Sequence, residues 1–348
     1  MKPTTISGVQ PSGRLHLGNY LGALKNFVEL QNAGEYNPFF FIADLHSLTE
    51  FPKTADEKQK QIFDLAADFL AAGLDPKQST LFIQSAVPAH AETYWILGSL
   101  TPLGELGRMT QFKDKGKIET QKKEKKEDGF IKAVEAREGR ESVNAGLLTY
   151  PILMASDILL YDAETVPVGE DQLQHLEFTR TLARKFNNTF GKTFVEPKPI
   201  LTSTPRLMSL DDPTKKMSKS SPSGCVFLDD TPETITEKIK RAVTDSGKTI
   251  EYDPLNRPGI SNLLLILSAF SGMSPKKLEK DFSGTGYGEF KTMVAEKIIA
   301  SLEPFRKKKL FFKRNPSLVK KAFEKGNKTA EKQSGKKLME IKKKVGLL

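Results

Sequence analysis

Three strand-like segments separated by helical patterns constrain the fold more than any other feature of this sequence. Residues 4–9 are typical of a short strand, and the apolar run at 38–44 is typical of a strand buried on both faces; a third strand follows at 79–85. Between these strands, residues 20–30 show helical periodicity, and residues 54–73 begin with a capping box and end at a glycine. Strands and helices that alternate at this spacing predict βαβ units and a parallel sheet.

The middle of the chain interrupts this pattern. Residues 113–142 are dense in charge and poor in apolar residues, with seven lysines and five acidic residues in 113–128. We expect an exposed, mobile insertion there, with a structured lid as the alternative. Ordered patterning resumes with a strand at 165–168 and a helix at 171–186.

After about residue 230 the pattern is almost entirely helical. Thr231 is the expected cap of the first of these helices, with Pro232 at its first position. Further helices are predicted over 260–271, 275–282, 288–313 and 316–345. We therefore predict an α/β domain over residues 1–225, which contains the insertion, and a helical region over 226–348 whose last helices can pack back on the first domain.

The positive charge of the chain is concentrated at its C-terminal end. The net charge is +10, and residues 297–348 hold 17 Lys and Arg against 4 Asp and Glu, with clusters at 306–309 and 342–344. A basic end on a nearly neutral body indicates a polyanionic partner, nucleic acid before membrane. A solvated, lysine-rich helical surface produces the same pattern, so charge alone leaves both interpretations open.

Composition excludes several classes of protein. Hydrophobic residues make up 38% of the chain, which excludes a wholly disordered protein. The single cysteine excludes an internal disulfide and a cysteine-based zinc site, and the four histidines lack metal-site spacing, so no metal held by the protein itself is expected. No apolar run approaches the roughly 20 residues of a membrane span. The first residues resemble neither a signal region nor a transit peptide, so we expect a cytoplasmic protein with no membrane partner.

The first motif that indicates chemistry is GVQPSGRLHLGNYLG at residues 8–22. It follows the first predicted strand and opens the first predicted helix, which is where ligands bind in doubly wound sheets. Helix N-termini favour phosphate, Gly13 and Gly18 let a ligand approach the backbone, and His16 and Asn19 add polar side chains. An ordinary glycine turn is the alternative, and the pattern lacks the usual G-x-G-x-x-G of dinucleotide-binding proteins.

The second motif is KMSKS at residues 216–220, within a segment rich in proline, glycine and serine. Two lysines flanked by small hydroxyl residues form a mobile cationic loop that can neutralise a departing pyrophosphate. A solvated lysine loop is the ordinary interpretation of a KxxK pattern. This pentapeptide is, however, expected by chance in only roughly one chain in ten thousand of this length, which makes it a strong signal.

A third feature is a carboxylate in an apolar helical stripe. Pro151 suits a first helical position, which makes Tyr150 the predicted cap and places Met154, Asp157 and Tyr161 on the same helix face as Tyr150. A buried carboxylate without a partner is costly. An ion pair with a neighbouring arginine, or exposure to solvent, is therefore the simpler interpretation of Asp157 from the pattern alone.

The two motifs occur together with further segments that resemble class I aminoacyl-tRNA synthetases, and among them the bacterial-type tryptophanyl-tRNA synthetases. The resemblance is spread over residues 5–290, whereas the last 50 residues match mainly in helical, basic character. The segments that carry it are SGVQPSGRLHLGNYLGAL, IQSAVPAHAE, RMTQFKDK, LLTYPILMASDILLYDAETVPVGEDQLQH, DPTKKMSKS, RAVTDS and PGISNLL.

The resemblance assigns roles to individual residues. It implies that Asp157 accepts the indole N–H of tryptophan, that Tyr150 and Gln172 hold the α-amino group, and that Val166 and Val168 form an apolar wall. The implied tryptophan pocket consists of Ile6, His46, Tyr150, Met154, Asp157, Val166, Val168 and Gln172. For His46, a role as a plain core histidine is nearly as well supported.

The implied ATP site surrounds the two motifs. His16 and Asn19 are expected at the phosphate end, and Lys216 and Lys219 are expected to hold the leaving pyrophosphate. The implied ATP contacts are Gln10, Pro11, Ser12, Gly18, Asn19, Gly169, Glu170, Asp171, Leu207, Lys216, Met217, Ser218, Lys219 and Ser220.

Two features depart from the family pattern. Ile6 stands where the family often has a phenylalanine behind the indole, which predicts weaker stacking. The insertion is longer than in compact members and follows Lys113 and Lys115, which match family lysines near the triphosphate. The roles of these two lysines are therefore left open.

The resemblance implies a Rossmann-like catalytic domain followed by a mainly α-helical anticodon-binding region. It also implies ATP-dependent activation of tryptophan with Mg²⁺, transfer to tRNA(Trp), and a homodimer. Three alternatives are a tyrosyl-type synthetase, a nucleotidyltransferase with an HxGH-like turn that does not act on tRNA, and an inactive RNA-binding paralogue. The GEDQ segment, the helical tail, and the intact HLGN and KMSKS motifs with Asp157 argue against these three in turn.

Overall fold

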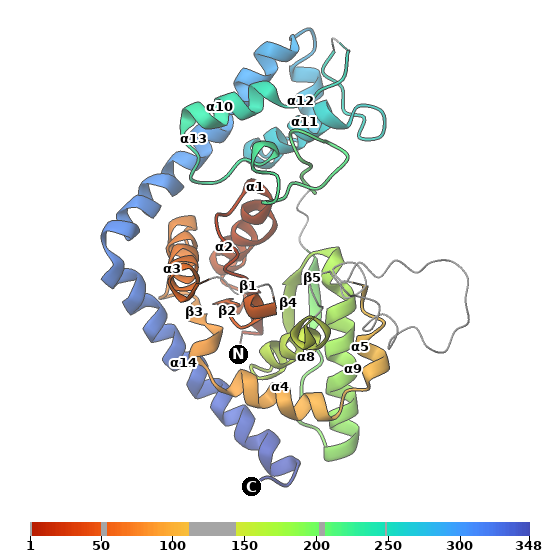
Figure 1. Cartoon of the computed structure of the whole chain (residues 1–348), viewed down its shortest axis with the longest axis vertical. Coiled ribbons are helices and arrows are strands. Elements are labelled where there is room, and N and C mark those ends of the chain that lie inside the picture. Colours follow the sequence, from red (N-terminus) through yellow and green to blue (C-terminus); the bar gives the residue numbers. More distant parts are fainter. Residues whose placement is uncertain (1, 50–53, 111–143, 202–205, 248) are drawn as a thin grey trace, which may run out of the picture.

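The computed structural model describes residues 2–49, 54–110, 144–201, 206–247 and 249–348. At its centre lies a five-stranded sheet in the order β3-β2-β1-β4-β5, in which every pairing is parallel (Figure 1). The strands are β1 (Thr4–Val9), β2 (Asn37–Ile42), β3 (Thr80–Ile83), β4 (Thr165–Val168) and β5 (Lys198–Leu201). The parallel sheet predicted from the sequence is therefore confirmed. The fifth strand was not predicted, because its four residues are mostly exposed and carry no alternating pattern.

Helices cover both faces of the sheet, which explains why β2 is apolar and buried from Pro38 to Ile42. Phe40 points to one face and stacks on Phe27 at 4.3 Å between ring centroids, beside α2 (Lys25–Ala33) and α3 (Ala55–Ala72). Phe39 and Phe41 point to the other face, against α4 (Ala89–Ser99), α8 (Ala145–Leu159) and α9 (Leu173–Phe190). A short α5 (Leu103–Leu106) lies between α4 and α8 in the chain. Each face of the strand therefore belongs to its own hydrophobic core.

The crossover after β1 differs from the single helix that the periodicity predicts. It consists of α1 (Leu17–Asn19), a wider π-helical turn over Tyr20–Leu24, and then α2. π-helical turns are rare and occur frequently at functional sites. Here the wider turn places Gly22 and Ala23 in the wall of the main cavity.

The predicted helix caps at Thr54 and Thr231 are confirmed. Thr54 accepts from the backbone of Glu57 while the Glu57 side chain accepts from the backbone of Thr54, so both halves of the capping box form at the start of α3. Thr231 caps α10 (Pro232–Arg241), which has a proline at its first position. Because capping satisfies otherwise unpaired backbone groups, these residue patterns reliably mark where a helix begins.

The predicted start of the helix that carries Asp157 is wrong. The helix α8 begins at Ala145 and is capped by Asn144, whose side chain accepts from the backbone of Leu147 at 2.9 Å. Pro151 therefore lies inside α8, and Tyr150 is a helical residue rather than the cap. A proline often marks the start of a helix, but here the Asn144 side chain satisfies a free N–H group six residues before the predicted cap at Tyr150.

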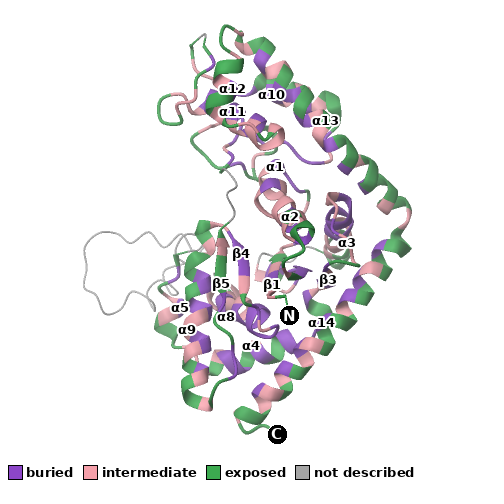
Figure 2. Ribbon diagram, turned by 180° about the vertical axis from the view of Figure 1, so that it is seen from behind, coloured by how far each residue is buried: buried purple, intermediate pink, exposed green. Residues whose placement is uncertain are grey.

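The C-terminal part is helical, as predicted. It contains α10, α11 (Pro258–Ser271), α12 (Pro275–Asp281), α13 (Tyr287–Arg314) and α14 (Pro316–Lys344). Helices α10 and α11 pack on α13, α12 packs on α11, and α13 also runs alongside α3. Figures 1 and 2 show α13 and α14 as one long arm that runs from the helical cluster past α3 and β3 to α4, with its buried residues facing inward.

The last helix, α14, covers the edge strand β3. The Asn327 side chain accepts from the backbone N–H of Ile83 at 2.9 Å, which supplies a partner that a neighbouring strand would otherwise provide. Gly326 lets the helix approach this closely, because a Cβ atom at this position would lie only 1.7 Å from the carbonyl oxygen of Leu81. The edge of the sheet is therefore closed by a helix rather than by a strand.

We expect Gly326→Ala to destabilise the protein by about 3 kcal/mol or more, because the new methyl group meets strand backbone that cannot rotate away. Gly335→Ala is the matched control: it lies on the same helix, and an added Cβ meets nothing within 4 Å. The control should be neutral or stabilising by up to ~1 kcal/mol, because alanine favours helix more than glycine. Urea unfolding measures both variants, and equal stabilities would contradict the close packing of α14 on β3.

Several cations of α13 and α14 form ion pairs with the body of the protein. Lys309 is buried and contacts Asp68 at 2.7 Å, and Arg306 donates to the backbone oxygen of Asp230. Burial raises the pKa of Asp68 to about 6, and the nearby Lys309 charge opposes that rise. Three further pairs are Lys313–Asp64, Lys337–Asp162 and Lys342–Glu92. Part of the C-terminal positive charge is therefore occupied in holding these helices in place.

Candidate active site

The main cavity opens between β1 and β4, where the strand order of the sheet reverses. Such a switch point, at the carboxyl ends of the strands, is the usual ligand site of doubly wound sheets. Pro167 helps to open it: its carbonyl accepts from the Ser7 hydroxyl, so its backbone faces β1, yet proline has no N–H to continue the ladder. Only Thr5 and Thr165 are paired between these two strands. The cavity has a volume of about 340 Å³.

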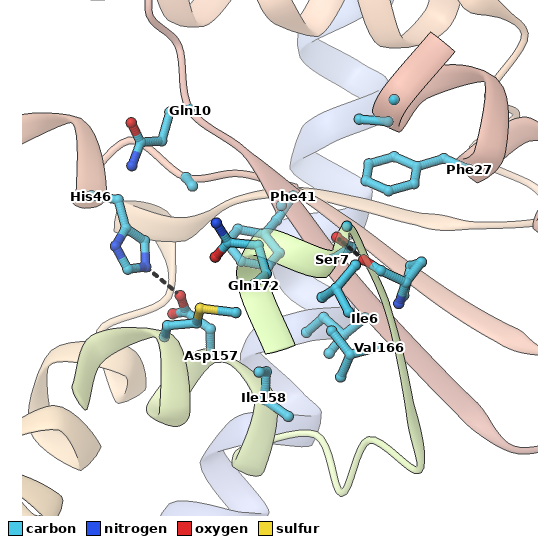
Figure 3. Close-up of a pocket in the computed structure, with 18 of the residues that line it drawn as sticks. Ile6, Ser7, Gln10, Phe27, Phe41, His46, Asp157, Ile158, Val166 and Gln172 are labelled. Atoms are coloured by element: carbon cyan, nitrogen blue, oxygen red, sulfur yellow. Dashed lines mark hydrogen bonds and ion pairs between the residues drawn. The ribbon is translucent and has the colours of Figure 1, made fainter. Parts of the chain in front are cut away.

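All eight residues of the expected tryptophan pocket line this one cavity. They come from β1, the segment after β2, helix α8, strand β4 and the short 3-10 turn between β4 and α9. Figure 3 shows Ile6, Phe41 and Val166 on the apolar side and His46 and Asp157 pointing toward one another. The lining residues that were expected are Ile6, His46, Tyr150, Met154, Asp157, Val166, Val168 and Gln172, and two expected ATP contacts, Gln10 and Gly169, line it as well.

Asp157 is nearly inaccessible, with 2% of its surface exposed, and it accepts three side-chain hydrogen bonds. Gln84 Nε2 and His90 Nδ1 bond to Oδ1 at 2.7 and 2.6 Å, and His46 Nε2 bonds to Oδ2 at 2.7 Å. Burial alone raises the pKa of Asp157, but the hydrogen bonds from His46 and His90 outweigh it and leave the pKa below its ordinary value. The carboxylate is therefore ionised, and its partners are not the arginine considered from the pattern.

Tyr150 is held from behind by a buried histidine. Its hydroxyl forms a 2.5 Å hydrogen bond with Nε2 of His175, which is fully buried on α9. Burial lowers the pKa of His175 to about 4, so the ring is neutral at pH 7. The phenol of Tyr150 is thus fixed at the wall of the cavity by a neutral partner.

His16 closes the turn after β1 by capping α1. Its Nδ1 accepts from the backbone of Asn19 while the Asn19 side chain accepts from the backbone of His16. Gly18 permits this arrangement, because a Cβ atom there would lie 2.9 Å from the His16 ring. Burial and then the charges of Lys219 and Lys216 lower the pKa of His16 to about 4. Since the neutral ring accepts at Nδ1, its proton is on Nε2, where it can be donated to a phosphate oxygen.

The KMSKS segment lies against the same turn. Lys219 Nζ donates to the hydroxyl of Ser12 at 2.8 Å and to its backbone oxygen at 3.3 Å. Met217 is buried in the core and donates its backbone N–H to Leu207. The buried methionine anchors the segment, and Lys216, Ser218 and Ser220 on either side remain exposed.

The remaining expected contacts lie around these two elements. Pro11 and Ser12 belong to the turn after β1, and Glu170 and Asp171 are exposed in the short 3-10 turn between β4 and α9. Leu207 is buried beside Met208, whose backbone is held at both ends by the side chain of Asn262 from α11. The expected insertion at 113–142, including Lys113 and Lys115, lies outside the described residues.

Comparison with known proteins assigns this arrangement to a family. The model of the tRNA synthetases class I (W and Y) matches residues 1–303. The chain belongs to this family.

Relatives within the family match almost the whole chain. The tryptophan--tRNA ligase of Clostridium tetani is 45% identical over 100% of this chain and 96% of its own length. The tryptophan--tRNA ligase of Caldanaerobacter subterraneus is 48% identical over 99% of this chain and 98% of its own length. These matches cover both the sheet and the helical C-terminal part.

Solved structures of class I synthetases have the same fold. Tryptophanyl-tRNA synthetase from Mycoplasma pneumoniae superposes with a TM-score of 0.85 at 35% identity, over 99% of this chain and 98% of that one. Tryptophanyl-tRNA synthetase from Campylobacter jejuni complexed with ADP and tryptophan superposes with a TM-score of 0.79 at 33% identity, over 99% of both chains. The fold class expected from the sequence is therefore confirmed.

Sequence reasoning missed several residues that support the synthetase site. Gln84 and His90 bind Asp157, His175 binds Tyr150, and Asn262 holds Met208. Gln84 and His90 lie within the segment IQSAVPAHAE, which carried part of the resemblance but was given no role. A buried polar side chain requires a partner, so a lone histidine and glutamine after a strand could have been paired with the equally lone Asp157.

Two kinds of feature are absent from the described residues. Within the described ranges, no three His, Cys, Asp or Glu side chains gather in a way that could bind a metal ion. No helix in the described part of the chain is long and apolar enough to cross a membrane.

Proposed function

We propose that this protein is a tryptophan--tRNA ligase that activates tryptophan with ATP and transfers it to tRNA(Trp). The observation that carries the proposal is an ionised carboxylate, Asp157, in the wall of a cavity otherwise lined largely by apolar side chains. Indole offers one N–H donor and no acceptor, so an acceptor-only group is its matching partner. Phenylalanine would leave that carboxylate without the bond, which supports its rejection.

The activation step needs positioning and charge neutralisation rather than a protein nucleophile. The tryptophan carboxylate attacks the α-phosphorus of ATP, and the bond to the pyrophosphate breaks. His16 donates from Nε2 at the phosphate end, and Lys219 and Lys216 bring positive charge to the same turn. These groups stabilise negative charge as it accumulates on the leaving pyrophosphate.

Mg²⁺ would reach this site with the nucleotide. The described residues offer no cluster of metal-binding side chains, so the phosphate oxygens themselves are its natural ligands. When bound, Mg²⁺ would add further positive charge beside the pyrophosphate. The protein contributes the positive charge of Lys216 and Lys219, which the segment 216–220 brings beside the turn at residues 12–19.

The proposal is tested by pyrophosphate exchange into ATP with each of the twenty amino acids. We expect exchange with tryptophan and at least a hundredfold lower kcat/KM with tyrosine and phenylalanine, about 2.7 kcal/mol of discrimination. Exchange driven by tyrosine would identify a tyrosyl-type enzyme instead. No exchange with any amino acid would contradict activation altogether.

We further propose that residues 1–225 form the catalytic domain and residues 226–348 the region that reaches the tRNA anticodon. Exposed lysines lie at spacings of three and four residues along α14, which places them on one face of the helix. They are Lys321, Lys325, Lys328, Lys332 and Lys336. This face is a better candidate for tRNA contact than Lys309 or Lys342, which are engaged with the body of the protein.

Replacing Lys325, Lys328 and Lys332 with glutamine is expected to raise KM for tRNA and to flatten its salt dependence. Each lost phosphate contact should remove about 0.7–0.9 unit from the log–log slope. Amino-acid activation without tRNA should stay within about twofold, because distant surface charges are screened. Lys192→Gln with Lys198→Gln is the control, since both lysines are exposed elsewhere. An unchanged tRNA KM and slope would mean that the α14 lysines only solvate the surface.

We also propose that the chain works as a cytoplasmic homodimer. Trp95 and Leu103, from the segment between β3 and β4, are 76% and 64% exposed, and exposed large apolar side chains frequently mark interfaces. Light scattering should give twice the chain mass, and Trp95→Glu should shift the population toward monomer. A wild-type monomer at micromolar concentration would contradict this assembly.

A further inference from the structure

A buried chain of hydrogen bonds runs from Asp157 away from the cavity to the C-terminal helix. His90 Nδ1 bonds to Asp157 Oδ1 at 2.6 Å, and His90 Nε2 bonds to the Tyr161 hydroxyl at 2.9 Å. On α14, Gln333 Nε2 donates to the backbone oxygen of Tyr161 at 3.1 Å, and the Ser334 side chain lies close to the Tyr161 hydroxyl. His90, Tyr161 and Ser334 are buried, and none of them lines the cavity.

We propose that His90, backed by Tyr161 and Ser334, is a positioning residue that sets the preference for tryptophan by fixing the orientation of the Asp157 carboxylate. The inference rests on the proposed function, because it concerns how the same carboxylate selects its substrate. His90 does not touch the cavity, so it acts through Asp157 rather than on the amino acid itself.

The two oxygens of Asp157 have different partners. Oδ1 accepts from both Gln84 and His90, which occupies its two lone pairs. Oδ2 accepts from His46, which lines the cavity, whereas Gln84 and His90 do not line it. Oδ2 is therefore the oxygen on the cavity side, and it is the one that an indole N–H would reach. The two donors on Oδ1 therefore fix the rotation of the Asp157 carboxylate that places Oδ2 on the cavity side.

The two hydrogen-bond partners of His90 determine which of its ring nitrogens carries the proton. An ionised carboxylate can only accept, so Nδ1 of His90 carries a proton. Burial raises the pKa of Tyr161, so its hydroxyl remains protonated and can donate to Nε2. The rings of Phe41 and Phe82 lie about 6 Å from the His90 ring, at 6.2 and 5.9 Å between centroids, and hold it within an apolar layer. Hydrogen bonds on both nitrogens and packing on the ring thus define one orientation.

Two substitutions separate positioning from simple packing. In His90→Asn, the amide nitrogen can reproduce Nδ1 and keep the bond to Asp157, but the link to Tyr161 is lost. In His90→Gln, the longer amide reproduces the position of Nε2 and keeps the contact with Tyr161, but the bond to Asp157 is lost. Both variants lose the same aromatic ring, so each is the packing control for the other.

The measurement is pyrophosphate exchange with tryptophan and with β-(3-benzothienyl)alanine, in which sulfur replaces the indole N–H. The preference for tryptophan, as a ratio of kcat/KM values, reports the hydrogen bond to Asp157 while both substrates have nearly the same shape. We expect His90→Gln to lower this preference by about tenfold and His90→Asn to keep it within about threefold of wild type. The wild-type enzyme must show the preference first; its failure to exchange tryptophan would contradict the proposed function instead.

A loss of activity in His90→Gln that is equal for both substrates would overturn the inference, because packing alone would explain it. The inference would also be overturned if His90→Asn lost as much of the preference for tryptophan as His90→Gln. If neither variant folds, Tyr161→Phe provides the test, since it removes only the hydroxyl that supports Nε2. We expect its preference for tryptophan to fall by about two- to threefold, in line with His90→Asn, which loses the same link, and an unchanged preference would exclude the supporting chain.

Discussion

Replacing Asp157 with asparagine is expected to lower kcat/KM for tryptophan by about a hundredfold or more, ~2.7 kcal/mol, without unfolding the protein. Gln84 and His90 both donate to Oδ1, so the amide oxygen of asparagine will occupy that side. Its NH2 group will then point toward the cavity and oppose the indole N–H, donor against donor. The effect therefore exceeds the simple loss of a charge-assisted hydrogen bond.

The control for this variant is Ser156→Ala, the neighbouring buried position on α8. The Ser156 hydroxyl bonds back to the carbonyl of Ile152 in the same helix, so its loss perturbs α8 without touching the carboxylate. Its exchange rate should stay within about threefold of wild type, since one local hydrogen bond is worth about 1 kcal/mol or less. A change under about threefold in Asp157→Asn would contradict the assigned role of Asp157.

Lys219→Ala is expected to slow adenylate formation by about 10²–10³-fold, with little change in KM for tryptophan. In this structure Lys219 bonds to Ser12 at the turn after β1, which holds its charge beside His16. That charge matters most as the pyrophosphate departs, so the defect should appear in the rate rather than in substrate binding. Rapid-quench measurement of the first turnover separates the two effects.

Lys215→Ala provides the matched control for Lys219. It is a lysine four positions away that is 78% exposed and pairs with Asp212 at 2.8 Å. Such a surface pair contributes little, so the control should activate tryptophan at nearly the wild-type rate. If the defect of Lys219→Ala consisted wholly of weaker ATP binding, Lys219 would anchor the ground state instead.

Local patterns were sufficient to predict most of the framework. The apolar run at 38–44 predicted β2, because strands covered on both faces are rich in apolar residues, and residues 4–9 have the pattern of the short strand β1. The helices after Thr54 and Thr231 were also predicted, since each begins with a residue whose side chain satisfies a free backbone N–H group. The strand at Thr165–Val168 was predicted from its strand-like residues. The expected pocket residues, although far apart in the sequence, line one cavity because strands β1 and β4, the segments that follow β2 and β4, and helix α8 meet there.

What the sequence could not provide is the set of contacts made across the fold. His90 and Gln84 bind Asp157 over separations of 67 and 73 residues, and no local pattern records such pairs. The start of α8 was misplaced because a proline and an asparagine both signal a helix start, and only the three-dimensional contacts decide between them. The pairing of α14 with β3 depends on a glycine that is unremarkable in a lysine-rich helix.

The helix that covers β3 also imposes an order on how this enzyme is made. During synthesis the sheet strands emerge first, yet the edge of β3 has no cover until α14, the last of the described elements, has left the ribosome. Until then the nascent chain presents an unpaired strand edge, which is a site for pairing with other chains. Completion of the catalytic body therefore has to wait for α14, and a chain cut short before α14 would be prone to aggregate rather than act as a smaller enzyme.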